Sequence, residues 1–456
     1  MGSFVRRVHF VGIGGVGMSG IAEVLHNLGY EVSGSDLKDT EVTRRLAGLG
    51  VSVMAGHAAG HVKGREVVVV SSAVSPDNPE VRAARAAGIP VIQRALMLAE
   101  LGRMKKTVTV AGSHGKTTTT SMVAMALRAA GADPTMVVGG QLKDIRSNAR
   151  LGVGEYLVAE ADESDGSFLH LSPLVAVVTN VDDDHLDYHK TVERLRASFA
   201  EHLRRLPFYG AAVVCVDDPP LKAIAAGLDR RVISYGFSPT ARWRAAELEL
   251  SSEGSACAVL CAGRRLGILR LRVPGRHNVL NALGALAAGS FLGFPFKALA
   301  RGLAEFRGVG RRLDVLGAAS GVTFVDDYGH HPTEVAATLA ALRLWKGRKV
   351  VIFQPHRYSR TKLMARRFGP AFKAADFVYV MDVYAAGEKP IPGVSSKLIL
   401  DALRRCRVPC ASFSSALETA RELAPGDVVL TLGAGDVWKV GEDLLRRKKT
   451  QFASPV

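Results

Sequence analysis

The 456-residue sequence is poor in cysteine, in aromatic residues and in long apolar runs. Its five cysteines are too few, and too unevenly placed, for a disulfide framework in a chain of this size. No apolar run reaches the roughly 18–20 residues that a membrane-spanning helix needs. The N-terminus leads directly into a strand-like run and lacks the apolar segment and cleavage site of a secretory signal. We therefore expect a cytoplasmic globular protein without membrane insertion.

Acidic residues are also scarce relative to basic ones, which gives a formal net charge of +16. A basic balance can indicate a nucleic-acid partner, but it suits any polyanionic substrate, nucleotides included. The sequence contains no aromatic-rich RNA-binding motif, zinc finger or convincing helix-turn-helix signature. Much of the excess is scattered over predicted helix faces, for example in residues 301–312 and 446–449. We expect a solvated basic surface with a few anion-binding arginines and no nucleic-acid partner.

Short β-rich runs alternate with helical stretches in three successive units. The first unit includes the run Val67–Ser71, whose four consecutive valines are typical of a strand buried on both faces of a parallel sheet. The second begins with the β-branched run Thr107–Ala111, which a helix from Thr117 to Ala130 follows. The third starts near Leu313. This alternation predicts an α/β fold of open parallel sheets in three consecutive domains, with boundaries near residues 104 and 310.

A glycine-rich loop, Gly12-Ile13-Gly14-Gly15-Val16-Gly17, directly follows the first strand and opens a helix. Glycines allow a tight turn and let the backbone approach a phosphate group at the helix N-terminus. Asp36 closes the second strand about 20 residues on, where a ribose-binding carboxylate is expected. The pattern predicts a Rossmann-like nucleotide site but does not identify the nucleotide. A dinucleotide cofactor remains an alternative at this point.

The second loop, Gly112-Ser113-His114-Gly115-Lys116-Thr117-Thr118, again lies between a strand and a helix. In a phosphate-binding loop the lysine reaches the β- and γ-phosphates, the threonine hydroxyl binds Mg²⁺ and backbone amides surround the phosphates. The standard motif has a glycine five positions before Gly115, where this chain has Val110. The loop is therefore a shortened relative of the standard one, and it predicts an ATPase-like central domain.

Polar residues follow several predicted strands at their carboxyl ends. Glu160 ends a buried strand and opens an acidic run that continues to Asp165. His185 follows three aspartates after the next strand, and the third unit has polar segments at residues 326–332 and 354–360. The carboxyl edge of a parallel sheet is where ligands bind, so Glu160 and His185 are candidate metal ligands. An acid cluster at a helix N-terminus and a structural histidine are the alternatives.

Together these motifs resemble the Mur ligase family of peptidoglycan synthesis, from Val8 to about Lys439. The matching segments are residues 111–120, 160–165, 274–281, 310–312, 326–332 and 353–360. The resemblance implies a Rossmann-like domain for the UDP-sugar in residues 1–104 and an ATP-binding domain in residues 105–310. A Rossmann-like α/β domain that binds the amino acid and closes over the site is implied for residues 311–456.

The resemblance also implies a reaction, in which ATP and two Mg²⁺ ions support ligation of L-alanine to the lactyl carboxylate of UDP-N-acetylmuramate. The product forms through an acyl phosphate, with release of ADP and phosphate. Another branch of the family attaches a recycled tripeptide, but Gly12–Gly20 and Tyr328-Gly329 fit the alanine-adding branch better. The sequence departs from the family pattern at Val181–Asp184 and at Asp436–Trp438. Amino-acid choice among alanine, glycine and serine is not determined by the motifs.

Residue roles are carried over from the family on the matching positions. The residues implied to face the UDP moiety are Gly14, Gly15, Val16, Gly17, Asp36, Ser72 and Arg94. Those implied to bind ATP are Gly112, Ser113, His114, Gly115, Lys116, Thr117, Thr118, His277, Asn281 and Arg312. Thr117 and Glu160 are expected to hold one ion, and Glu160 and His185 the second. Asp327, Tyr328, His330, Arg357 and Arg360 are expected around the acid and the amino acid, with His330 or Asp327 accepting the proton of the amine.

Two other classes of protein account for fewer of these motifs than a ligase does. An oxidoreductase with a dinucleotide at Gly12–Gly17 would leave the second loop and the acidic runs without a purpose. A regulatory or binding protein with a phosphate-binding loop would leave the polar motifs of the third unit unexplained.

Overall fold

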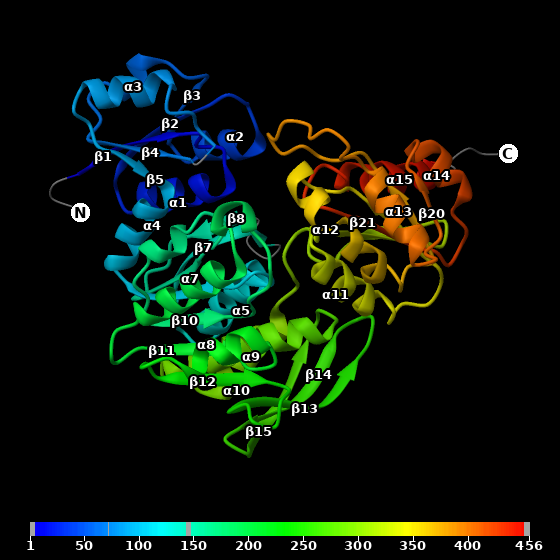
Figure 1. Ribbon diagram of the computed structural model, residues 1–456. Helices are drawn as coiled ribbons and strands as arrows, with labels where there is room; N and C mark the ends of the chain where they lie inside the picture. The colour runs from blue at the N-terminus through cyan, green and yellow to red at the C-terminus, as the bar shows by residue number, and fades with distance from the viewer. Residues whose placement is uncertain (1–4, 72, 143–146, 451–456) are drawn as a thin grey trace. The chain divides into compact units, whose positions relative to one another are not determined.

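The computed structural model describes residues 5–71, 73–142 and 147–450 of the chain, and Figure 1 labels its elements. The chain divides into two compact units. The first comprises Met1–Glu247, Cys257–Arg270 and Val279–Arg307. It contains two of the three sheets, apart from the ends of strands β13, β14 and β15. The second unit contains the third sheet.

The first sheet has five parallel strands in the order β3-β2-β1-β4-β5. Their bounds are β1 Arg7–Val11, β2 Glu31–Asp36, β3 Ser52–Ala55, β4 Val67–Val70 and β5 Val91–Gln93. The helices of this part are α1 Val16–Asn27, α2 Glu41–Gly48, η1 Ala59–Val62, α3 Pro79–Ala86 and α4 Arg94–Arg103. Because β1 pairs with both β2 and β4, the strand order reverses at β1. In open α/β sheets this switch point is where a ligand-binding crevice forms.

The second sheet has ten strands in the order β15-β14-β13-β12-β11-β10-β6-β9-β7-β8. Its central strands are β6 Lys106–Ala111, β9 Tyr156–Glu160 and β10 Val175–Val178. The others are β7 Thr135–Leu142, β8 Ser147–Arg150, β11 Ala211–Cys215, β12 Val232–Gly236, β13 Trp243–Leu250, β14 Ser255–Cys261 and β15 Arg264–Leu271. Strand β6 pairs in parallel with β9 on one side and β10 on the other. The segments that follow these three strands therefore emerge at one edge.

Helix α5, Lys116–Ala129, is buried along almost its whole length. It packs against α10, Phe296–Glu305, so closely that a Cβ atom on Gly302 would lie 2.6 Å from the Met125 carbonyl oxygen. The remaining helices are η2 Ser167–His170, α6 Leu186–His189, α7 Val192–Arg204, α8 Pro219–Ala226 and α9 Arg276–Phe291. The tight packing fixes the axis of α5, and with it the direction of the helix N-terminus that follows the second glycine loop.

The second unit comprises Leu248–Ala256, Leu271–Asn278 and Gly308–Val456. Its six-stranded sheet has the order β16-β17-β21-β18-β19-β20, with β16 antiparallel and the others parallel. The strands are β16 Asp314–Ala319, β17 Val322–Asp327, β18 Lys349–Phe353, β19 Phe377–Val380, β20 Cys410–Ser412 and β21 Val428–Leu432. The helices are α11 Pro332–Leu342, α12 Tyr358–Ala371, α13 Lys397–Arg405, α14 Ala416–Glu422 and α15 Trp438–Thr450.

Alternate residues of β18 pack into two separate apolar clusters of the second unit. Val351 and Phe353 belong to a cluster with residues of α11, α12 and α13. Val350 and Ile352 belong to another with residues of α14 and α15. Successive side chains of a strand point to opposite faces, so both faces of this sheet are covered by helices. Because side chains on both faces are buried, the sequences of its central strands are continuous apolar runs.

The structure confirms the predicted three-part α/β fold with parallel sheets. The predicted strands and long helices are present to within a few residues, but several elements were not predicted. The short helix α2 has few apolar positions, and α4 follows β5 directly without a polar N-cap bond. The antiparallel strand β16 has the sequence DVLGAA and is half-buried or exposed at every position. Helix α4 and strand β16 depend on tertiary packing, whereas α2 also carries a local signal, the cap that the Thr40 hydroxyl makes by accepting from the Thr43 amide.

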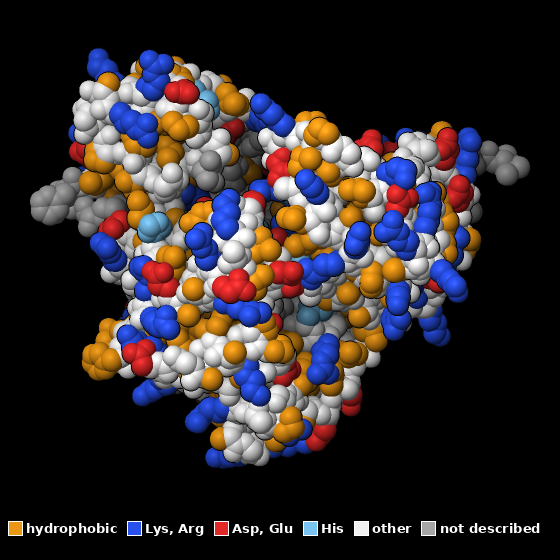
Figure 2. Space-filling view, viewed as in Figure 1, with side chains coloured by type: hydrophobic (Ala, Val, Ile, Leu, Met, Phe, Trp, Pro, Cys, Tyr) orange, Lys and Arg blue, Asp and Glu red, His pale blue; other side chains and the backbone are white. Residues whose placement is uncertain are grey.

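Basic side chains are distributed over the face drawn in Figure 2 and are interspersed with Asp and Glu. This distribution agrees with a solvated basic surface. Within the described part of the chain, no helix combines the length and the apolar character required to cross a bilayer.

Phe353 provides a test of the packing in the second unit. It is fully buried, with its ring centroid 5.0 Å from that of Phe368 and 5.1 Å from that of Phe372. We expect Phe353→Ala to lower the free energy of unfolding by about 3–5 kcal/mol through lost contacts and a residual cavity. Urea denaturation followed by tryptophan fluorescence measures the change. Leu363→Ala in α12, at a side chain 67% exposed, is the control, and equal effects of the two changes would contradict the packing described.

Candidate functional site

The loop between β6 and α5 depends on two glycines with left-handed backbone. Gly112 has φ of 136° and Gly115 has φ of 79°, conformations that side chains rarely adopt. A Cβ atom on Gly112 would overlap the Thr179 hydroxyl, and one on Gly115 would lie 2.9 Å from the Asn281 Oδ1 atom. Asn281 is buried and borders this loop, and its expected role in the nucleotide site stays a prediction. The loop passes too close to its neighbours for larger residues at either position.

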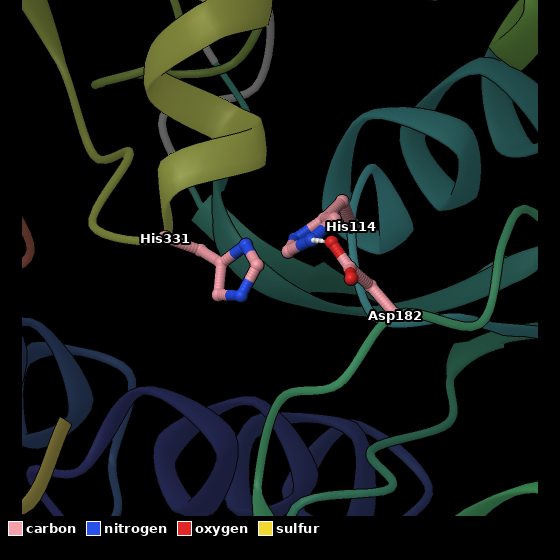
Figure 3. Close-up of side chains that lie close together, drawn as sticks. All are labelled: His114, Asp182 and His331. Atoms are coloured by element: carbon pink, nitrogen blue, oxygen red, sulfur yellow. Dashed lines mark hydrogen bonds and ion pairs between the residues drawn. The ribbon is translucent and has the colours of Figure 1, made fainter. Parts of the chain in front are cut away.

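Residues that follow β10 hold the middle of the loop. The His114 amide donates to Asn180 Oδ1 at 2.9 Å, and the Thr179 hydroxyl donates to the His114 carbonyl at 2.6 Å. Figure 3 shows the His114 imidazole turned toward the Asp182 carboxylate, with 2.9 Å between Nε2 and Oδ2. The Asp182 amide in turn donates to the Ser113 hydroxyl at 2.9 Å. Asn180 was not expected in this site, and Asp182 was noted only as the start of the acidic run that leads to His185.

Lys116, the first residue of α5, makes a buried ion pair with Glu163. Its Nζ atom lies 2.8 Å from each Glu163 carboxylate oxygen and donates to the Gly112 carbonyl at 2.8 Å. Burial opposes the charge of Lys116, but the carboxylates of Glu163, Asp162 and Glu160 outweigh it and hold the pKa of Lys116 above its usual value. Burial raises the pKa of Glu163 above its usual value, and the charge of Lys116 opposes that shift. Lys116 is thus held as a cation in the loop, paired with the Glu163 carboxylate.

The acidic side chains near this lysine offer oxygen atoms of the kind that a hard cation takes. Glu160, at the end of β9, accepts a hydrogen bond from the Gly139 amide at 2.8 Å. His185 Nε2 lies 3.8 Å from a Glu163 oxygen and 3.6 Å from Asp184 Oδ2. Mg²⁺ prefers oxygen ligands, so the Glu160 carboxylate and the Thr117 hydroxyl suit the expected metal by their chemistry, whereas His185 offers a nitrogen. The structure places His185 next to Glu163, and its sharing of an ion with Glu160 stays a prediction.

A cavity of the first unit lies between helix α4 and the end of β9. Arg94, at the start of α4, lines it together with Glu160. The remaining lining residues are Ala95, Leu98, Asp162, Ser167, Phe168 and Leu171. The Arg94 guanidinium also approaches Gly17 so closely that a Cβ atom there would overlap it. Arg94 therefore connects the first glycine loop with the acidic end of β9.

In the first glycine loop, the Gly14 amide donates to Asp36 Oδ2 at 2.9 Å. The Gly12 amide donates to the Ser35 carbonyl at 2.8 Å. Asp36 thus lies where it was expected, at the end of β2, and also fixes the turn. Gly15 caps α1, which Val16 begins. Ser72 and the Val16 side chain lie outside the described part of the structure.

Strand register brings the polar segments of the second unit to one sheet edge. Asp327 pairs with Leu432, which also pairs with Phe353. Asp327 is buried, and its two oxygens accept hydrogen bonds from the amides of Leu313 at 2.7 Å and Gly329 at 2.8 Å. Burial raises its pKa to about 6. These bonds make Asp327 a support of the turn that follows β17.

That turn carries Tyr328 and His330. The Arg312 guanidinium lies over the Tyr328 ring, 5.0 Å from its centroid, and Arg312 Nη1 lies 3.4 Å from Glu334 Oε1. His330 Nδ1 lies 3.1 Å from the Tyr328 carbonyl oxygen. His331, drawn in Figure 3, caps α11 by accepting from the amide of Thr333 at 3.3 Å. The structure therefore groups Arg312, which was expected in the ATP site, with Tyr328 and His330, which were expected around the acid and the amino acid.

Arg357 and Arg360 begin helix α12 at the same edge. Arg357 caps the helix with φ of 66°, and its amide donates to the Tyr384 carbonyl at 2.8 Å. Arg360 Nη1 lies 3.3 Å from His356 Nδ1, and the His356 ring stacks on Tyr384 at 5.7 Å. His356 and Tyr384 were not among the expected site residues. Tyr384 could be found only from the fold, because its loop follows another strand.

His277 belongs to the second unit, whereas Asn281 belongs to the first. Burial, with the Arg312 charge as a smaller contribution, lowers the pKa of His277 to about 4. The imidazole is therefore neutral near pH 7. A neutral ring is compatible with the expected position beside an uncharged nucleobase.

The pKa of Asp327 predicts a pH effect on stability. Its folded value of about 6 exceeds the ordinary 3.8, so the folded protein binds more protons between these values. The stability contribution is therefore present below pH 4 and is lost as pH rises through 6, by about 3 kcal/mol in total. Urea unfolding of the wild type and Asp327→Asn at several pH values isolates this term, because other groups cancel in the difference. A difference that does not change between pH 4 and 7 would argue against a buried, proton-binding Asp327.

Comparisons with known proteins extend over nearly the whole chain. Residues 7–106 match the model described as Mur ligase family, catalytic domain; residues 110–289 match the Mur ligase middle domain, and residues 311–435 the Mur ligase, glutamate ligase domain. A UDP-N-acetylmuramate–L-alanine ligase of Geobacter sp. (strain M21) is 52% identical over 98% of both chains. The solved UDP-N-acetylmuramate-alanine ligase of Thermotoga maritima is 31% identical with a TM-score of 0.82, over 98% of this chain and 99% of the other.

A solved murein peptide ligase from Psychrobacter arcticus is similar in fold, with a TM-score of 0.71 at 23% identity over 97% of this chain and 98% of that one. The three matching domain models and the extended identity lead to one assignment. The chain belongs to the Mur ligase family.

Proposed function

We propose that this chain is an ATP-dependent ligase that joins L-alanine to the lactyl carboxylate of UDP-N-acetylmuramate. The observation that carries the proposal is the Gly112–Lys116 loop, in which a buried lysine faces an acidic strand end beside a cavity. The names of the Geobacter and Thermotoga relatives support the choice of substrates. We further propose that the reaction takes place in the cytoplasm.

The reaction requires two steps, because a carboxylate is a poor acyl donor. A lactyl carboxylate oxygen attacks the γ-phosphorus of ATP, the bond to the bridging oxygen breaks and ADP leaves with that electron pair. The neutral amine of L-alanine then attacks the carbonyl carbon of the acyl phosphate. The tetrahedral intermediate loses phosphate and a proton, which gives the amide. The products are UDP-N-acetylmuramoyl-L-alanine, ADP and phosphate.

The protein stabilises charge in the first step and positions groups in both. Lys116 and the amides of the Gly112–Gly115 loop would face the transferring phosphoryl group. Thr117, Glu160 and His185 would hold Mg²⁺, which supplies additional neutralisation of the phosphate charge when bound. Asp36, Arg94, Ser72 and the Gly14–Gly17 turn would bind the UDP moiety. These roles, and the domain limits 1–104, 105–310 and 311–456, are part of the proposal.

Within the second unit we favour His330 over Asp327 as the proton acceptor. Both Asp327 oxygens are engaged by backbone amides, so proton acceptance would compete with support of the turn. Tyr328, Arg357 and Arg360 would bind the carboxylates of the substrates, which suits guanidinium groups.

Phosphate release tests the proposal. Purified full-length protein is incubated with ATP, Mg²⁺ and UDP-N-acetylmuramate, with and without L-alanine, glycine or L-serine. We expect release that requires both substrates and is fastest with L-alanine. Phosphate release only with a tripeptide would assign the chain to the recycling branch. No phosphate release with any combination of substrates would refute the proposed ligase activity.

The Gly112 backbone gives a sharper prediction for the loop. A Cβ atom at Gly112 would overlap the Thr179 hydroxyl and lie 3.1 Å from the Asn180 carbonyl oxygen. We expect Gly112→Ala to lower kcat/KM for ATP by about 100-fold or more, because the loop must shift away from the phosphate position. Steady-state kinetics measure this effect. Gly131→Ala is the matched control, since Gly131 also has positive φ, 88°, but no neighbour within 4 Å; a similar loss there would contradict the explanation.

A further inference from the structure

Glu163 has no role among the expected site residues, although it lies in the acidic run that begins at Glu160. Its side chain has 0% exposure, and its two oxygens lie at equal 2.8 Å distances from Lys116 Nζ. By contrast, the Asp162 side chain is 38% exposed and approaches Nζ only to 3.9 Å. Glu163 is therefore the direct counter-ion of the lysine.

The hydrogen-bonding capacity of Lys116 is filled in this arrangement. An ammonium group has three N–H donors, and three acceptor atoms surround Nζ at 2.8 Å: the Gly112 carbonyl and both Glu163 oxygens. A phosphate oxygen can reach Nζ only by displacing one of them. The Gly112 carbonyl is part of a loop held by the Ser113 amide bond to the Asn180 carbonyl. The Glu163 carboxylate is carried by a side chain and not by the loop backbone, so we take it as the acceptor that yields.

The surroundings of Glu163 provide for its release. Its backbone carbonyl accepts a hydrogen bond from His189 Nε2 at 2.8 Å, which holds the main chain while the side chain turns. His185 Nε2 lies 3.8 Å from Glu163 Oε1, and Asp184 Oδ2 lies 3.6 Å from the same nitrogen. A Glu163 carboxylate that leaves Lys116 thus remains close to His185 and Asp184. Such a group needs a cation, because an unpaired buried carboxylate is strongly unfavourable.

We propose that Glu163 is an internal counter-ion that occupies Lys116 until a nucleotide arrives together with a divalent cation, so that the loop selects the metal–nucleotide complex over metal-free nucleotide. The inference rests on the proposed use of ATP at this loop. Metal-free ATP would displace the Glu163 carboxylate from Lys116. The negatively charged phosphates and the negatively charged carboxylate would then lie side by side. Metal-bound ATP brings the positive charge that the released carboxylate requires. Glu163 is thus a specificity-determining residue for the form of the nucleotide.

The experiment measures binding rather than turnover. Isothermal titration calorimetry of the full-length protein gives Kd for ATP with excess EDTA and for ATP with Mg²⁺, in wild type and Glu163→Gln. In the variant the loss of the negative charge should strengthen binding of metal-free ATP and reduce the ratio of the two Kd values by about tenfold or more. Glu163→Asp keeps the charge and should retain a ratio close to that of the wild type.

Asp162→Asn is the matched control, because it removes one negative charge from the same loop without removing the direct partner of Lys116. We expect it to change the ratio by less than about threefold. An equal change in Asp162→Asn and Glu163→Gln, or no change in Glu163→Gln, would overturn the inference. So would a wild-type protein that binds ATP equally well with and without Mg²⁺, a result that requires no variant. Absence of any wild-type binding of Mg²⁺–ATP would instead refute the proposed function.

Discussion

Strand β6 lies between β9 and β10 and is parallel to both, and the arrangement of the first unit's site follows from this pairing. The three strands end at one edge, so the loop after β6 meets Glu160 from one side and Thr179 from the other. The loop can then turn sharply into α5 only with glycines at positions 112 and 115. Helix α5 is fixed behind it by its close packing on α10. Register, turn and helix direction together determine where Lys116 points.

A lysine in that position is buried, and burial of an unpaired ammonium group is unfavourable. Glu163 offsets this cost, because its negative charge and its two oxygens replace the water that the Lys116 ammonium group loses on burial. Taking two ions out of water costs several kcal/mol, so such a pair contributes little to net stability unless its geometry is good. The Lys116–Glu163 pair instead has an electrostatic role, because it keeps Lys116 charged at the edge of the sheet. Stability comes mainly from the apolar strands and helices around it.

The sequence predicted the features that are local. A glycine loop between a strand and a helix is a contiguous pattern, so the positions of Gly112–Thr118 and of Gly12–Gly17 could be expected before the fold was known. Glu163 could not be assigned, because the choice between it and Glu160 depends on the path of the chain after β9. Tyr384 likewise follows a strand that pairs beside β18, and its contact with His356 exists only in the folded sheet. The roles of such residues depend on which strands pair in the folded sheet, so no pattern in the neighbouring sequence predicts them.

Carboxylates at strand ends serve two physically different purposes in this chain. Asp36, Glu160 and Asp327 each accept a hydrogen bond from the amide of a nearby backbone segment, at Gly14, Gly139 and Gly329. Such an acid holds a turn in place, and its movement would leave a backbone donor without a partner.

Both oxygens of Glu163 instead face the side-chain cation of Lys116. An acid paired mainly with the flexible side chain of a lysine can exchange that partner for another cation more easily than an acid that holds a turn. The hydrogen-bond partners of these acids therefore separate the carboxylates that support the site from the one best able to respond to a ligand. Sequence position at a strand end does not make this distinction.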